Sequence, residues 1–232
     1  MMHYGYGYMF DPTLFILIPG ILFTMYAQFK VSSTTSRYFR VQSRLGYTGE
    51  QTARKILDAN GLYNVNIEMV RGSLSDHYDP RSNVVRLSQD VYSGTSITSV
   101  SVAAHECGHA IQHAKGYAPL QMRSSLVPVV NFASNISWFL IFIGFFMTGP
   151  FLKIGILLFS ASVIFQIITL PVEFNASSRA MVQIGNEGIL EGKEIKQGRE
   201  VLTAAALTYV AAALASVLQL LRLIAISQRR DD

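Results

Sequence analysis

The stretch SITSVSVAAHECGHAIQHAKG (residues 96–116) decides how the polar part of this 232-residue chain folds. Small and apolar residues fall on several faces of a helix drawn through it, so this helix is expected to be mostly buried. Ser96 is a favoured N-cap residue, Lys115 lies in the last turn, and Gly116 stands where a C-cap glycine is usual. The pattern predicts one buried helix between Ser96 and Gly116.

This helix contains the H-E-x-x-H pattern, as His105-Glu106-Cys107-Gly108-His109. Residues four apart on a helix point the same way, so the two imidazoles can hold one metal ion. Zinc suits two such nitrogens plus a carboxylate and an open fourth position. We predict one Zn2+ per chain bound by His105 and His109, with Glu106 as the catalytic base that takes a proton from the metal-activated water.

Two other residues of the helix have simpler roles. His113 continues the series of histidines, but eight residues advance a helix by about 12 Å, too far for His105 and His113 to share one ion. We expect His113 to support the site or to be structural. Cys107 points away from the metal face and is expected to pack as a small buried hydrophobe. Because it is the single cysteine, no internal disulfide is possible.

Upstream of the metal helix, the sequence predicts a small α+β region. TGEQTARKILDANG (residues 48–61) places Ala53, Ile56 and Leu57 at helical spacing, and Gly61 can end that helix. VNIEMV (residues 65–70) alternates apolar and polar residues, and NVVRLS (residues 83–88) is β-branched. With DHYDPRSN (residues 76–83) supplying turn residues between them, these two strands are expected to form a hairpin.

Outside this region, the chain is apolar in long runs. Only 15% of its residues are charged, against roughly a quarter in soluble domains. Uncharged runs cover 18 positions between Asp11 and Lys30, 29 between Arg123 and Lys153, 19 between Lys153 and Glu173, and 21 between Glu200 and Arg222. About 20 apolar residues span a bilayer, so we predict about four transmembrane helices.

The basic residues give these helices an orientation. Of 19 basic residues, 11 lie from Lys30 to Arg123 and 4 from Glu173 to Glu200. The positive-inside rule then puts both polar stretches in the cytoplasm and the Tyr/Gly-rich N-terminus outside. No basic residue precedes the first apolar run and no small-residue cleavage site closes it, so we expect it to be a retained anchor and not a cleaved signal peptide. Arg222, Arg229 and Arg230 fall on the opposite side. This leaves open whether the last apolar run, which is rich in alanine, crosses completely.

The domain organisation follows from these runs. We expect an N-terminal transmembrane anchor (1–30), a cytoplasmic α+β part with the H-E-x-x-H helix (31–123), a transmembrane hairpin (124–172), a cytoplasmic segment (173–200), and a C-terminal transmembrane helix and tail (201–232). The net charge of +4 is explained by basic residues that flank the spans, so no nucleic acid is expected as a partner.

A catalytic site needs a third ligand, for which Glu173 is the best candidate. It stands just past Pro171, where the third apolar run stops. The alternative is that Glu173 only marks the membrane boundary. Four later carboxylates alternate with basic residues as a solvated face does, and are poorer candidates: Glu187, Glu191, Glu194 and Glu200.

Three stretches together resemble the bacterial membrane-bound neutral zinc metallopeptidase family. They are DHYDPRSNVVRLSQDVYSG, HECGHAIQHAKGYAPLQMRSSLVPVVNFAS and EFNASSRA. The chain is more distantly similar to the integral-membrane gluzincins, namely the HtpX heat-shock protease and the CaaX prenyl protease. This resemblance implies an α-helical membrane protein with a small gluzincin-like metallopeptidase domain. It also implies that Glu173 completes the zinc site, and it places Ser177 where those relatives have an aspartate.

The resemblance also implies that the strand before the metal helix, here Leu74 to Tyr78, holds the substrate. An exposed strand edge offers backbone groups with which an extended peptide can pair. His77 and Tyr78 are therefore candidate substrate-binding residues that would hydrogen-bond the tetrahedral intermediate. The alternative for His77 is a turn residue bonded to backbone.

The sequence thus predicts a zinc metalloendopeptidase, embedded in the plasma membrane with its site facing the cytoplasm. Its partners would be the lipid bilayer and protein or peptide substrates, membrane or membrane-proximal proteins that are unfolded or flexible. The alternative is a non-catalytic membrane scaffold with a structural metal site, which four protein ligands would favour. A transporter has little support, since few titratable groups border the middle spans.

Overall fold

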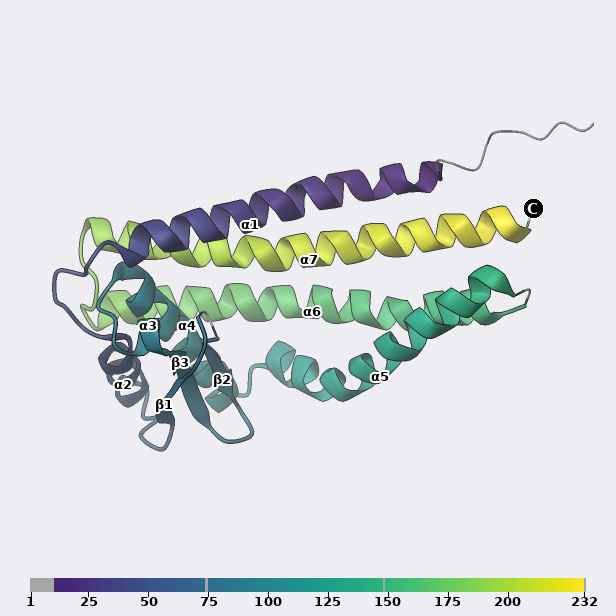
Figure 1. Cartoon of the computed structure of the whole chain (residues 1–232). Coiled ribbons are helices and arrows are strands. Elements are labelled where there is room, and N and C mark those ends of the chain that lie inside the picture. The colour runs from purple at the N-terminus through teal and green to yellow at the C-terminus, as the bar shows by residue number, and fades with distance from the viewer. Residues whose placement is uncertain (1–10, 74, 148, 232) are drawn as a thin grey trace, which may run out of the picture. The chain divides into compact units, whose positions relative to one another are not determined.

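The computed structural model describes residues 11–73, 75–147 and 149–231, which form a mainly helical protein with one small sheet (Figure 1). The elements follow one another as a 3₁₀ helix Pro12–Leu17, α1 Ile18–Phe39, α2 Gly49–Ala59, β1 Asn66–Val70, β2 His77–Asp79, β3 Val84–Ser88, α3 Gln89–Tyr92, α4 Ile97–Ala114, α5 Ala118–Phe146, α6 Phe151–Asn186 and α7 Lys193–Asp231. The expected fold class, a helical membrane protein with a small α+β part, is confirmed.

These elements form two compact units. The first, called here the bundle unit, comprises residues 11–26, Ser125–Ile167 and residues 210–231. The second, the sheet unit, comprises Ala27–Ser124 and Ile168–Tyr209. The long helices α1, α5, α6 and α7 each contribute residues to both units.

Four helical segments are long and apolar enough to cross a membrane: Pro12–Phe39, Ala118–Phe146, Phe151–Asn186 and Lys193–Arg229. Many of their large apolar side chains are exposed, among them Phe29, Phe132, Phe146 and Leu157. Such surfaces are stable when they face lipid. Each segment extends past the apolar run that predicts it, because the helices continue into the polar stretches.

Inside the bundle unit, small residues allow α5 and α6 to pack closely. A side chain at Gly144 or Gly155 would meet backbone atoms of Leu152 or Ile141 on the other helix. The hydroxyl of Ser137 donates to the carbonyl of Gly155 at 2.9 Å. Small residues of this kind are typical of helix contacts in membranes.

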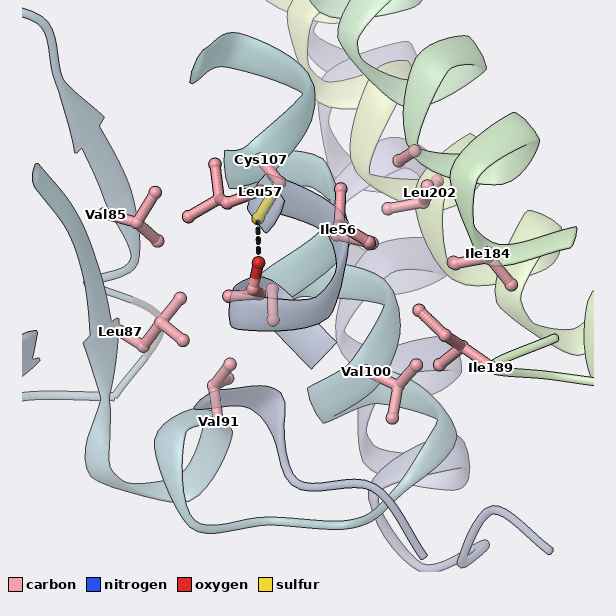
Figure 2. Close-up of a cluster of buried hydrophobic side chains, with 14 of the residues drawn as sticks. Ile56, Leu57, Val85, Leu87, Val91, Val100, Cys107, Ile184, Ile189 and Leu202 are labelled. Carbon is pink, nitrogen blue, oxygen red and sulfur yellow. Dashed lines mark hydrogen bonds between the residues drawn. The ribbon is translucent and has the colours of Figure 1, made fainter. Parts of the chain in front are cut away.

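The sheet unit is built around α4, as expected for a buried helix. Ser96 caps its N-terminus by accepting from the N–H of Ser99, and Gly116 follows its end with φ +61°. The helix α2 begins with the capping box of Thr48 and Gln51. Apolar side chains from α2, β3, α4, α6 and α7 share one core, which includes Ile56, Leu57, Leu87, Val100, Ile184 and Leu202 (Figure 2).

The sheet corrects one prediction. The strand order is β1-β3-β2, and β1 runs parallel to β3 with Ile67 opposite Val85, so these two strands do not form the expected hairpin. Instead, His77–Asp79 forms β2, which pairs antiparallel with β3. The local pattern placed these residues in a turn, whereas the family resemblance placed His77 and Tyr78 in a strand. Alternation and β-branching indicate that a segment is a strand but carry no information on the direction of its partner.

Candidate metal centre

The two histidines of the motif lie side by side on α4. Their ring centroids are 4.8 Å apart and the rings are nearly perpendicular. Both side chains are mostly buried, with 15% of His105 and 11% of His109 exposed. The i, i+4 spacing on a helix produces this arrangement, with both imidazoles on one face of α4.

Glu173 reaches this pair from α6. Its Oε2 lies 3.3 Å from Nε2 of His105 and 3.5 Å from Nε2 of His109, and its side chain is 2% exposed. Among the described residues, these three form a group that could hold a metal ion, with all ligand atoms within 4.8 Å of one another. Glu106 and the other described carboxylates are not part of that group.

The two histidine nitrogens and the carboxylate oxygen are compatible with a zinc site. Oε2 of Glu173 is buried and has no hydrogen-bond partner, and an unsatisfied buried carboxylate oxygen is costly. Ligand atoms about 2.0–2.1 Å from a tetrahedral zinc are about 3.3–3.4 Å from each other, close to the two Oε2–Nε2 distances. No fourth His, Cys, Asp or Glu of the described chain joins the group. A catalytic site, which keeps one position open, has this composition.

The remaining ring nitrogens of both histidines have partners of their own. Nδ1 of His105 lies 3.2 Å from the hydroxyl of Ser177. Nδ1 of His109 lies 3.0 Å from Oε1 of Gln112. These contacts orient the imidazoles so that both Nε2 atoms face Glu173.

Two further residues interact with Glu173. Nη1 of Arg123 on α5 lies 3.3 Å from Oε1 of Glu173. Tyr209 on α7 interacts with Glu173, Glu106 and Arg123. Sequence reasoning missed Arg123 and Tyr209, because only the packing of helices that are distant in the sequence brings them to the site. It also missed Gln112, which lies three positions after His109 on α4; the i, i+3 spacing could have indicated that contact.

The candidate substrate residues lie outside the metal-binding group. The ring of His77 is exposed, and its Nδ1 lies 2.8 Å from the carbonyl of Ser75. Tyr78 donates to Oδ1 of Asn83 and contacts Nδ1 of His113, each at 2.8 Å. His113 thus connects the last turn of α4 to β2. Leu74, where the substrate strand was expected to begin, lies outside the described residues.

Cys107 packs as expected. The side chain is fully buried, and its sulfur lies 3.6 Å from the carbonyl oxygen of Ala53, the contact dashed in Figure 2. Burial raises the pKa of the Cys107 thiol, which therefore stays protonated. This protonated thiol is a poor metal ligand and a poor nucleophile.

The later carboxylates make surface contacts. Both Glu191 and Glu194 contact Arg44. The carboxylate of Glu191 forms an ion pair with the guanidinium of Arg44, and the carboxylate of Glu194 accepts from the backbone N–H of Arg44. Glu200 accepts from the hydroxyl of Tyr38. Glu187 is outside the metal-binding group.

Comparison with known proteins gives a consistent result. The family model described as "Putative neutral zinc metallopeptidase" matches residues 13–228. The chain is 52% identical over 215 residues to the "Putative membrane protease YugP" of Bacillus subtilis (strain 168). The aligned residues cover 92% of this chain and 95% of the relative. No solved structure matches. The chain belongs to the neutral zinc metallopeptidase family.

Proposed function

We propose that this protein is a zinc endopeptidase of the plasma membrane that cleaves unfolded or flexible segments of membrane or membrane-proximal proteins. One observation carries the proposal: Oε2 of Glu173, which is buried without a hydrogen-bond partner, lies 3.3 Å from Nε2 of His105 and 3.5 Å from Nε2 of His109. Zinc bound by these three atoms would act as a Lewis acid on water and on the scissile carbonyl.

Glu106 is the proposed general base. It follows His105 on α4, is 7% exposed and is not among the three ligands. A carboxylate in this position takes the proton from the attacking water and delivers it to the leaving amine.

The test of this function is metal removal. Protein purified in detergent is expected to contain about one zinc per chain and to cleave an unfolded protein such as casein. A chelator should abolish cleavage and added zinc should restore it, because the proposed hydrolysis depends on the metal. A protein that holds its metal and cleaves no unfolded soluble or membrane substrate would be the non-catalytic scaffold instead.

We further propose that the metal site faces the cytoplasm. Reporter fusions or cysteine labelling should place Asp58 and Lys196 inside and Gly149 outside, following the distribution of basic residues. An external Asp58 would contradict this topology.

The bundle unit supports an external position for the basic C-terminal end. Asp11 lies 3.2 Å from Arg222 and 3.8 Å from Arg229, and these contacts compensate basic charge on that side. The hydroxyl of Thr13, and then its N–H, keep the pKa of Asp11 below the ordinary value, so the carboxyl stays charged. Arg229 should therefore label from outside. A cytoplasmic Arg229 would show that α7 does not cross.

Substrate is proposed to bind along β2. This strand is at one end of the sheet order β1-β3-β2, so its outer edge is free within the described sheet to pair with an extended peptide. Backbone pairing does not depend on side chains, which predicts broad cleavage specificity and a requirement for unfolded or flexible substrates.

Variants of β2 test the roles of its side chains. Burial, and then Asp79, raise the pKa of Tyr78 to about 12, so its hydroxyl stays protonated, and binding an intermediate would require it to exchange its bond to Asn83. If His77 and Tyr78 bind the tetrahedral intermediate, replacing either by alanine should lower kcat by about 10²-fold without changing zinc content. Tyr63→Ala, at an exposed tyrosine before β1, is the control. Unchanged turnover in both variants would show that His77 and Tyr78 are ordinary structural residues.

A further inference from the structure

Gln112 is a fully buried polar residue whose amide contacts both helices that carry the candidate ligands. It follows His109 by three positions on α4, and its Oε1 lies 3.0 Å from Nδ1 of that histidine. Its Nε2 donates to the carbonyl of Val172 at 2.7 Å and to Oδ1 of Asn175 at 3.0 Å. Both acceptors belong to α6, one on either side of Glu173.

The contacts on α6 determine which way the amide points. The carbonyl of Val172 can only accept, so the NH2 group of Gln112 must face it. Oδ1 of Asn175 is itself fixed as an acceptor, because Nε of Arg179 donates to it at 2.7 Å. Both N–H groups of Gln112 are therefore used on α6, and its Oε1 is left for His109.

This orientation fixes the tautomer of His109. Because an amide oxygen cannot donate, the hydrogen between Oε1 of Gln112 and Nδ1 of His109 belongs to the imidazole. In the neutral ring, Nε2 then carries the lone pair, and Nε2 is the atom that faces Glu173. Ser177 does not constrain His105 in this way, because its hydroxyl can donate or accept.

We infer that Gln112 is a positioning residue that sets the tautomer of His109 and holds the Glu173 segment of α6 at a fixed distance from α4. This inference rests on the proposed function, since it assumes that the three ligands hold zinc. Gln112 itself touches neither the reacting water nor the substrate. It acts through His109 and through the backbone on either side of Glu173.

Zinc affinity, measured by competition with a chromogenic chelator, tests the inference apart from proteolysis. Gln112→Met keeps the length of the side chain but removes all three hydrogen bonds, and should weaken zinc binding by about 10–100-fold. Gln112→Glu retains an acceptor for Nδ1 of His109 but cannot donate to Val172 and Asn175 as the amide does. Its zinc affinity should lie between those of the wild type and the methionine variant.

A matched control is Gln183→Met on α6. Oε1 of Gln183 accepts from Asn60 at 2.9 Å, so the same substitution removes a hydrogen bond away from the candidate ligands and should leave zinc affinity unchanged. Thermal unfolding of the metal-free proteins, compared across the variants, separates a loss of positioning from a general loss of stability.

The outcomes distinguish this inference from the proposed function. Wild-type protein that binds no zinc would overturn both. Wild-type protein that binds zinc, with unchanged affinity in Gln112→Met, would overturn the positioning role alone. Equal weakening in the methionine and glutamate variants would contradict the role of Oε1 in setting the tautomer of His109.

Discussion

Glu106→Gln is expected to retain about one zinc per chain and to lower kcat/KM for proteolysis by about 10²–10⁴-fold. The amide has nearly the same shape as the carboxylate, so it should fit the same buried place on α4. It cannot take a proton from water, and the loss is therefore expected in the chemical step. Zinc content by elemental analysis and cleavage of an unfolded substrate, both on the same preparation, check this result.

The ligand variants provide the contrast. His105→Ala, His109→Ala and Glu173→Ala should each lose zinc together with activity, because each removes one of the three atoms that meet at the site. If Glu106→Gln also lost its zinc, Glu106 would be a ligand and the proposed base would have to be another residue. Full zinc occupancy in Glu173→Ala would move the third-ligand assignment to another carboxylate.

Local sequence patterns predicted most of the elements that build this site. The capped helix α4 and its pair of imidazoles follow from a spacing that any helix obeys, and Glu173 follows from the abrupt end of an apolar run. The predicted antiparallel pairing of β1 with β3 is wrong, because strand patterns reflect burial and do not specify the pairing partner or its direction. The roles proposed for Glu106, His77 and Tyr78 remain predictions.

The residues that surround the ligands were beyond prediction from local patterns. From the sequence, Gln112 is only one more residue of a buried helix. Its partners on α6, Val172 and Asn175, lie 60 and 63 positions away in the sequence. From the sequence, Arg123 is a basic residue that flanks a membrane span, whereas in the structure its guanidinium contacts Glu173. Contacts of this range depend on how helices pack, which no local spacing in one sequence encodes.

Gly108, within the H-E-x-x-H motif, shows how close that packing is. A Cβ at this position would lie 3.0 Å from the carbonyl carbon and 3.2 Å from the Cα of Ala176, and closer still to the carbonyl oxygen of that residue. All three atoms belong to the backbone of α6, which cannot move aside as a flexible side chain can. Glu173 stands one turn earlier on the same helix, so the lack of a side chain at Gly108 lets the backbone that carries this carboxylate lie close to α4.

Gly108→Ala should therefore lower zinc affinity and proteolysis together, although alanine is the better helix former by about 0.8–1 kcal/mol. The added methyl pushes α4 away from α6, whereas zinc tolerates ligand displacements of only about 0.2 Å. Gly185→Ala is the matched control: it makes the same substitution on α6, where a Cβ meets nothing within 4 Å, and should leave both properties unchanged. Full zinc binding in Gly108→Ala would mean that α4 and α6 can separate without moving Glu173 away from the histidines.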